Sequence, residues 1–141
     1  MKKLLTTTFL AFSFSIICTA QMSDIQLVEK TLNYYLEGGT NNDFDMLQKA
    51  FHPTATMKYI GDEYKEVNAV EFFKKGMKPG PKQNRKTRIV AVNVTGNAAN
   101  ATLEIEYPTF YFIDYMNLLR VDGEWKIVGK IFHRKSKDEV E

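Results

Sequence analysis

The sequence predicts an α+β domain in which three helices of the N-terminal half pack on one face of a strongly curved, antiparallel or mixed sheet. Apolar residues at helical spacing lie in the first half of the chain, before Gly76. The second half contains alternating apolar and polar residues around two turn signals, Gly96-Asn97 and Asp122-Gly123. The 141 residues suffice for one domain with a core and show no internal repeat. We therefore expect a single domain over residues 21–135 and a charged tail over residues 136–141.

The first helix is predicted from a capping signal and an apolar stripe. Ser23-Asp24 can cap its start, and its apolar residues recur at spacings of three and four, as on one face of an α-helix. We expect the helix to end at Gly38-Gly39, because glycine commonly follows the last helical turn. The stripe consists of Ile25, Val28, Leu32 and Tyr35.

Two shorter helices are expected to follow. Asn42-Asp43 can cap the second, which Pro53 would end, and Asn68 can cap the third, which Gly76 would end. Residues 77–84 show no periodicity and are typical of a loop. The apolar residues of these helices are Phe44, Leu47 and Phe51 in the second, and Val70, Phe72 and Phe73 in the third.

The strands are predicted as hairpins. A strand over residues 55–60, a turn at Gly61-Asp62 and a short strand ending at Val67 separate the second helix from the third. Residues 87–95 and 98–107 form a hairpin around Gly96-Asn97. A two-residue loop places three apolar pairs on one face, which agrees with the turn. These pairs are Val90 with Leu103, Val92 with Ala101 and Val94 with Ala99.

The longest hairpin covers residues 107–134 and turns at Asp122-Gly123. With a two-residue loop, one face of it is largely apolar and is interrupted by two polar groups, as in the lining of many ligand cavities. A bulge would exchange the two faces from that point onward. The opposite face, with Lys130, is more polar. The apolar face contains the pairs Arg120 with Trp125, Leu118 with Ile127, Met116 with Gly129, Asp114 with Ile131, and Phe112 with His133.

Residues 1–20 have the features of a signal peptide. Lys2-Lys3 precedes an apolar run over residues 4–17, and Cys18-Thr19-Ala20 supplies small residues before a cleavage site at Gln21. A lipid anchor on Cys18 would need a small residue before it, where this chain has isoleucine. The apolar run is also short for a membrane span. We expect an exported protein, periplasmic or extracellular, without stable membrane insertion.

The charge and cysteine content exclude several classes of function. Two of the 19 basic residues lie in the expected signal peptide, which has no acidic residue, so 17 basic residues remain against 17 acidic ones. A mature domain without net charge does not indicate nucleic-acid binding. The single cysteine is lost with the signal peptide. The mature domain therefore has no disulfide and no thiol nucleophile.

The predicted order of elements is accompanied by a set of short motifs, namely Tyr35, Glu37-Gly38, Ala50 to Pro53, Asp114-Tyr115, Leu118-Leu119, Asp122 to Val128, Lys130 and Phe132-His133. With this order and these motifs, about residues 24–134 resemble the cone fold of the NTF2-like superfamily, also called SnoaL-like or ketosteroid-isomerase-like, and its lumazine-binding subgroup in particular. The resemblance implies a conical pocket between helices and sheet, a small-molecule ligand, and often a homodimer through the outer face of the sheet.

The resemblance and the predicted register together suggest a set of ligand-binding residues. The chain is 13% aromatic, and aromatic side chains lining a cone would suit a flat heterocycle such as a pterin or a flavin fragment. The expected pocket residues are Tyr35, His52, Tyr59, Phe112, Asp114, Met116, Trp125 and Ile131.

Asp114 and His133 are the candidates for acid–base chemistry. In the predicted register they are diagonal neighbours on one face, and a carboxylate that orients an imidazole is a common general-base arrangement. Alternatively, Asp114 is a buried acid with satisfied hydrogen bonds and His133 lies at a solvated strand end. His52 similarly either contributes to the pocket or only caps the second helix. Isomerase chemistry is disfavoured, because the positions that the resemblance assigns to its two acids hold Tyr59 and Asn117.

Three functions therefore remain open. The first is an exported binding protein with a mostly apolar and aromatic pocket. The second is a cofactor-free enzyme that uses Asp114 and His133, and the third is an oligomerising or partner-binding module that acts through the outer face of the sheet. We expect no cofactor, and no metal site, since only two histidines are present and they lack metal-binding spacing.

Overall fold

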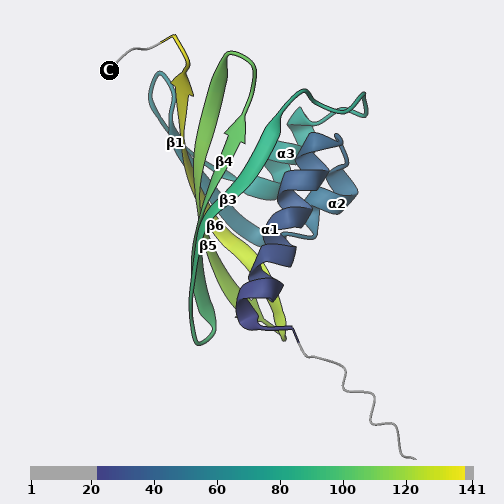
Figure 1. Cartoon of the computed structure of the whole chain (residues 1–141), viewed down its shortest axis with the longest axis vertical. Coiled ribbons are helices and arrows are strands. Elements are labelled where there is room, and N and C mark those ends of the chain that lie inside the picture. Colours follow the sequence, from purple (N-terminus) through teal and green to yellow (C-terminus); the bar gives the residue numbers. More distant parts are fainter. Residues whose placement is uncertain (1–21, 139–141) are drawn as a thin grey trace, which may run out of the picture.

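A computed structural model describes residues 22–138 of the chain, so the predicted signal peptide and the last residues of the tail lie outside the described part. Within these residues, three helices and six strands are arranged as a helical layer against one sheet (Figure 1). In chain order the elements are α1 (Asp24–Thr40), α2 (Phe44–Gln48), β1 (Phe51–Ile60), β2 (Tyr64–Asn68), α3 (Ala69–Gly76), β3 (Lys86–Thr95), β4 (Ala98–Glu106), β5 (Phe110–Val121) and β6 (Glu124–Ser136).

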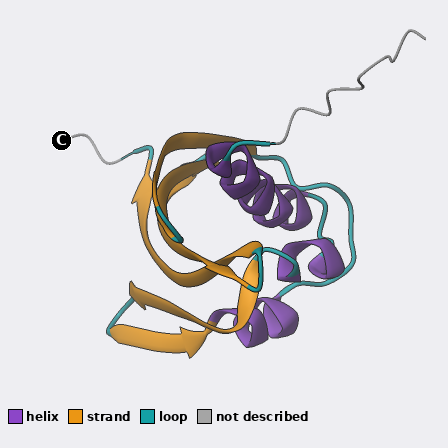
Figure 2. Ribbon diagram, turned by 90° about the horizontal axis from the view of Figure 1, so that it is seen from below, coloured by secondary structure: helices purple, strands orange, loops and turns teal. Residues whose placement is uncertain are grey.

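The six strands form one mixed sheet in the order β2-β1-β6-β5-β4-β3. All neighbours are antiparallel except β1 and β6, which run parallel. The sheet curls around the helices, which cover its concave side (Figure 2). The predicted α+β class with a curved sheet and three helices on one face is confirmed. Among residues 22–138, no helix is both long enough and apolar enough to cross a membrane.

The core lies between α1 and the concave face of the sheet. Val28, Leu32 and Tyr35 are buried as the apolar stripe predicts, whereas Ile25 at the start of the helix remains 48% exposed. Ser23 caps α1 in a capping box with Gln26. The stripe therefore places Tyr35 against the centre of the sheet.

The prediction that α1 ends at Gly38-Gly39 is wrong, because the helix continues through both glycines to Thr40. A Cβ atom on Gly38 would lie 2.5 Å from the backbone nitrogen of Leu47, so the absence of a side chain lets α2 approach α1. Gly39 likewise leaves room for the guanidinium group of Arg85. Close packing, and not helix termination, explains these two residues.

Pro53 does not end α2, as the sequence suggested, but lies inside β1. The helix ends at Gln48, and Phe51 begins a strand in which it pairs with Ile127 of β6. The pairing with β6 then shifts and resumes at Thr56, so Pro53 lies where no ladder partner is required. Strand β1 is consequently four residues longer at its start than the predicted strand over residues 55–60.

Both long hairpins contain a bulge that the predicted registers lacked. In the β3–β4 hairpin the pairs of Val92 and Val94 are confirmed, but Ile89, and not Val90, lies opposite Leu103, so the predicted pairing of Val90 is wrong. Val90 is 48% exposed as a result. The extra residue exchanges the two faces on which the remaining side chains of β3 lie, as expected for a bulge.

The bulge in the β5–β6 hairpin affects the site directly. Arg120 pairs with Trp125 and Leu118 with Ile127 as predicted, but Asn117 pairs with Gly129, which leaves Val128 as the extra residue. Beyond this point the predicted register is wrong. Asp114 lies opposite Phe132 and not Ile131, Met116 opposite Lys130 and not Gly129, and Phe112 opposite Arg134 and not His133.

The predicted boundary between domain and tail falls inside the last strand. Strand β6 runs to Ser136, and the backbone amide of Lys137 donates to the carbonyl of Thr109 at 3.0 Å. Lys137 also forms an ion pair with Glu106 at 2.5 Å. Residues 136 and 137 are therefore attached to the sheet.

Candidate functional site

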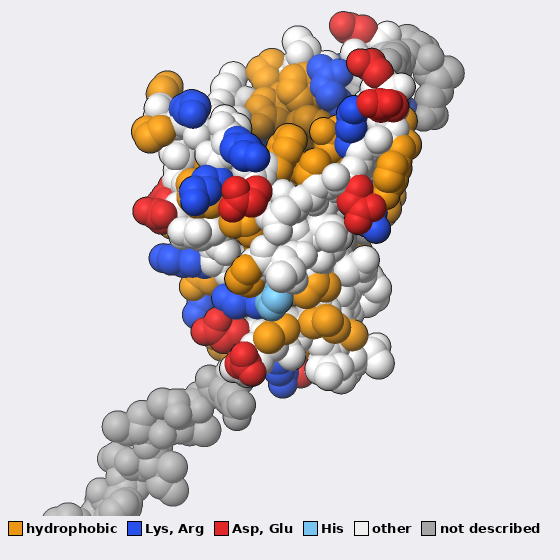
Figure 3. Space-filling model, turned by 180° about the vertical axis from the view of Figure 1, so that it is seen from behind, with side chains coloured by type: hydrophobic (Ala, Val, Ile, Leu, Met, Phe, Trp, Pro, Cys, Tyr) orange, Lys and Arg blue, Asp and Glu red, His pale blue; other side chains and the backbone are white. Residues whose placement is uncertain are grey.

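A cavity of about 240 Å³ lies between the helices and the concave face of the sheet. Its surroundings are mostly apolar, and an apolar hollow with basic side chains at its margin is visible on the face shown in Figure 3. The inner end is formed by buried residues, including Leu47, Met57 and Ile105. Around the outer part, half-buried or exposed aromatic rings gather from three elements and one loop, namely Phe72 and Phe73 of α3, Tyr107 of the loop before β5, Phe112 of β5 and Phe132 of β6.

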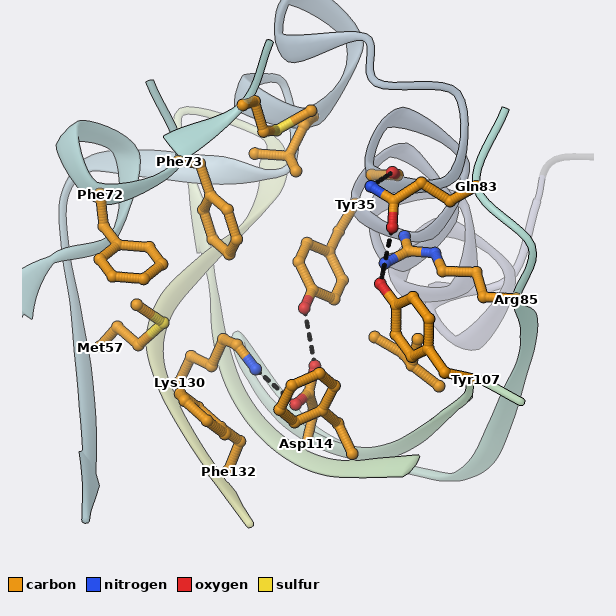
Figure 4. Close-up of a pocket in the computed structure, with 15 residues that line it drawn as sticks. Tyr35, Met57, Phe72, Phe73, Gln83, Arg85, Tyr107, Asp114, Lys130 and Phe132 are labelled. Carbon is orange, nitrogen blue, oxygen red and sulfur yellow. Dashed lines mark hydrogen bonds and ion pairs between the residues drawn. The ribbon is translucent and has the colours of Figure 1, made fainter. Parts of the chain in front are cut away.

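Three polar side chains meet at the inner end of this cavity. The Tyr35 hydroxyl donates to Oδ2 of Asp114 at 2.7 Å, and Nζ of Lys130 forms an ion pair with Oδ1 at 2.5 Å. Figure 4 shows Tyr35 and Lys130 both pointing toward Asp114. Asp114 is 1% and Lys130 is 5% exposed. We call these residues the buried triad.

Burial dominates the electrostatics of the buried triad. Loss of water lowers the pKa of Lys130 from its ordinary value, and the neighbouring Asp114 carboxylate opposes this effect without cancelling it. Burial also raises the pKa of Tyr35 well above that of a free phenol, and the Asp114 charge raises it further. Tyr35 is therefore a neutral donor at ordinary pH, while Lys130 gives up its proton more easily than an exposed lysine does.

Aromatic rings complete the surroundings of the Lys130 amine. Its Nζ lies 4.5 Å from the centre of the Phe132 ring and 5.6 Å from that of Tyr35. Such contacts stabilise a buried ammonium group in part. The amine thus has one carboxylate and two ring faces as neighbours, and it lines the cavity.

The bulge at Val128 is what turns Lys130 inward. Trp125 and Ile127 are buried before it, and Lys130 is buried after it, so the inward positions change from odd to even numbers. The sequence contains a signal for this change, because a lone glycine inside a strand, here Gly129, often marks a bulge. The predicted placement of Lys130 on the polar outer face is therefore wrong.

A second cluster of polar side chains lines the cavity beside the end of α1, and the sequence did not reveal it. Arg85 donates to the carbonyl of Leu36 at 2.9 Å and to the hydroxyls of Thr40 and Tyr107 at 2.9 and 3.0 Å. Gln83 donates to the carbonyl of Gly39 at 3.1 Å and accepts from the Tyr107 hydroxyl at 2.8 Å. These contacts satisfy carbonyl groups at the helix end, where a cation is also favoured. Both residues come from a loop without sequence periodicity, so no pattern predicted their position.

The residues predicted to bind a ligand do not all meet in the structure. Tyr35, Phe112 and Asp114 line the cavity. Met116 is buried in the core without lining it, and Tyr59 stacks on Phe132 with ring centres 4.9 Å apart.

The other predicted pocket residues lie elsewhere. Trp125 is buried beside a separate hollow that α1 forms with the β5–β6 turn. Ile131 points away from the cavity and is 52% exposed, a consequence of the bulge. The side chain of His52 is held locally, with Nδ1 2.8 Å from the Thr54 hydroxyl.

The predicted pairing of Asp114 with His133 does not occur. His133 lies opposite Ile113, is exposed, and belongs to the outer face beyond the bulge. Asp114 instead contacts Lys130 and Tyr35. Over residues 22–138, no three side chains of the His, Cys, Asp and Glu types gather closely enough to hold a metal ion.

Comparison with known proteins identifies the family. Residues 23–133 match the profile of the family described as "Putative lumazine-binding". The chain belongs to this family. The resemblance to the lumazine-binding subgroup of the NTF2-like superfamily is thereby confirmed.

Solved structures agree on the fold. An NTF2-like protein of unknown function from Shewanella baltica is 27% identical with a TM-score of 0.70, and the match covers 82% of this chain and 98% of that one. A similar protein from Methylobacillus flagellatus is 29% identical with a TM-score of 0.71, covering 83% and 96%. A ketosteroid isomerase-like protein from Erwinia carotovora has a TM-score of 0.62 at 11% identity, covering 79% and 95%, which shows the fold alone.

A curated relative has an assigned activity. The chain is 25% identical over 114 residues to a protein of Cladobotryum sp. named "Aldolase FrzH", and the match covers 79% of this chain and 91% of that protein.

Proposed function

We propose that this member of the lumazine-binding family is an exported protein that binds a small, flat, mostly apolar molecule in the cavity above the buried triad. The observation that carries the proposal is the cavity itself, in which aromatic rings surround an apolar space and charged groups meet at one end. Ligand sites commonly combine an apolar lining with a few convergent polar groups.

The size of the cavity limits the ligand. A cavity of about 150 Å³ in another protein binds benzene. The cavity of this protein, at about 240 Å³, has room for a bicyclic ring system. The rings of Phe112 and Phe132 can contact the faces or edges of a flat ligand. Its polar edge would face Lys130 and Asp114, while its apolar part would lie toward Phe72 and Met77.

Native mass spectrometry of the protein purified from its own source tests the proposal. We expect a retained small molecule, released on denaturation, whose occupancy falls in the Lys130→Met variant. Lys126→Met is the matched control, because Lys126 lies on the same strand and contacts Glu124 and the Lys49 carbonyl outside the cavity. Equal ligand occupancy in the two variants would show that Lys130 of the buried triad does not contribute to ligand binding. An empty protein that also fails to bind bicyclic heteroaromatic probes would refute the proposal.

A second candidate function is proton transfer without a cofactor, by the buried triad in place of the predicted Asp114–His133 pair. Lys130 with a lowered pKa and a carboxylate 2.5 Å away could exchange a proton with a bound carbonyl compound. The similarity to a protein named as an aldolase supports a carbonyl compound as the substrate of this second function. Deuterium exchange at the α-carbon of small ketones, followed by NMR in heavy water, tests this function. A rate equal to that of the Lys130→Met variant would refute it.

Export and dimerisation complete the proposal. The signal-like residues 1–20 support cleavage before Gln21, and intact mass of exported material tests the site. A lipid on Cys18 or a mass that includes earlier residues would contradict it.

The outer face supports a homodimer. Tyr115 and Ile131 are directly paired there and are 51% and 52% exposed, an apolar pair on a sheet face that the helices leave uncovered. We expect the mature protein to sediment as a dimer and the Ile131→Glu variant to sediment as a monomer. Ile60→Glu is the control, since Ile60 is 74% exposed at the far end of β1. A monomeric wild-type protein would refute the dimer.

A further inference from the structure

The amine of Lys130 is both buried and accessible from the cavity, which distinguishes it from the other described lysines. Among residues 22–138, the other lysine side chains for which ion pairs are described are much more exposed, from 26% for Lys126 to 44% for Lys65. That of Lys130 is 4% exposed, yet it lines a cavity that can admit a ring-sized molecule. A buried lysine beside an apolar cavity is the usual setting for an amine nucleophile.

We propose that Lys130 captures aldehydes or ketones in the cavity as a Schiff base. The inference rests on the proposed ligand pocket and specifies the class of its ligand. Asp114 would accept the proton of the ammonium group across the 2.5 Å contact, which frees the amine to attack the carbonyl carbon. Tyr35 would hold the carboxylate in place through its hydrogen bond of 2.7 Å.

The reaction is balanced within the triad. The ammonium group of Lys130 transfers one proton to Asp114, and its nitrogen bonds to the carbonyl carbon while the π bond of the carbonyl group breaks. A second proton then moves from this nitrogen to the alkoxide oxygen, which gives a neutral carbinolamine. The resulting hydroxyl takes the proton back from Asp114 and leaves as water, so that an iminium ion remains. Ammonium plus carbonyl compound thus gives iminium plus water, with one positive charge on each side. No oxidant, reductant or metal is needed.

The unchanged positive charge explains why the site can hold the iminium product. The iminium ion has the charge of the ammonium group that it replaces, so Asp114 keeps an opposite charge beside it. The ring of Phe132, 4.5 Å from Nζ, faces a cation before and after the reaction. A buried pair therefore does not need to lose its charge balance for the amine to react.

Reductive trapping tests the proposal on the intact mature protein. Benzaldehyde and sodium cyanoborohydride would be added near neutral pH, and the adducts mapped by peptide mass spectrometry. We expect benzylation at Lys130 to exceed that at Lys126 by about tenfold or more, because the amine is less protonated and the aldehyde is held beside it. The adducts are mapped on the wild-type protein, so the test does not depend on whether a Lys130 variant folds.

Benzyl alcohol separates the two levels of the proposal, since it has the same ring but cannot form an imine. If it binds and Lys130 is modified no faster than Lys126, Schiff-base formation is refuted while the ligand pocket stands. If neither compound binds, the proposed function fails as well. Preferred modification at Lys130 that benzyl alcohol suppresses supports both.

Discussion

Replacing Lys130 by methionine would leave the Asp114 carboxylate in the core with the Tyr35 hydroxyl as its remaining described partner. Both charged side chains are at most 4% exposed, so the pair belongs to the buried class. Breaking such a pair by removing one partner costs about 3–5 kcal/mol. With a urea dependence of about 1.5 kcal/mol per molar, the unfolding midpoint should fall by about 2–3 M.

A second substitution tests the same reasoning, because its effect on stability should have the opposite sign. Asp114→Asn removes the charge but keeps an oxygen that can accept the Tyr35 hydrogen bond. Added to Lys130→Met, it should therefore raise stability by about 1–3 kcal/mol, because an uncompensated buried charge disappears. The assay is urea unfolding of the wild type, both single variants and the double variant.

A surface pair provides the control for this cycle. Lys58 and Glu66 are 3.5 Å apart with side chains 43% and 48% exposed, so Lys58→Met should cost less than about 1 kcal/mol. If Asp114→Asn lowers the stability of the Lys130→Met protein further, the two residues do not compensate each other's charge, and the account of the buried triad is wrong.

Three further predictions concern packing and pH. Gly38→Ala should destabilise by about 1–3 kcal/mol in urea unfolding, because its Cβ would meet the Leu47 backbone, whereas Gly76→Ala, with open space around it, should be neutral or stabilising; equal effects would contradict this packing. Trp125, 3% exposed, should emit at short wavelength in the native state, and Trp125→Ala should cost about 3–5 kcal/mol; water-like emission would exclude its burial. Burial lowers the pKa of Lys130 in the folded protein, so the unfolded chain binds more protons at pH values below the ordinary lysine pKa near 10.5. The stability advantage of wild type over Lys130→Met should therefore grow as the pH rises toward that value, and a constant difference would contradict the shift.

The sequence was sufficient to predict the fold class and to place two members of the buried triad, Tyr35 and Asp114, on the inner side. Apolar spacing placed Tyr35 on the inner face of α1, and turn chemistry fixed the first pairs of the central hairpin at Arg120 and Trp125. These features are local, because helical periodicity and turn residues act within a few positions. Asp114 was placed inward for the same reason.

The other half of the site depends on features that local patterns do not report. A single extra residue at Val128 exchanged Ile131 and His133 for Lys130 and Phe132 on the inner face. Arg85 reaches the end of α1 from a loop 45 residues after Thr40 in sequence, and only the closed fold brings them together. The sequence alone could not determine whether Gly38 ends a helix or admits a neighbouring one, since both uses of glycine look the same.

The bulge at Val128 means that the chemistry of this cavity is selected by one residue of chain length. Deleting Val128 would restore simple alternation along β6 and turn Ile131 and His133 toward the helices. Lys130 would then join the outer face, and Asp114 would have an imidazole within diagonal reach in place of an amine. The same scaffold can thus present either a carboxylate–amine or a carboxylate–imidazole site, and a one-residue insertion or deletion in β6 would convert one into the other without a substitution inside the cavity.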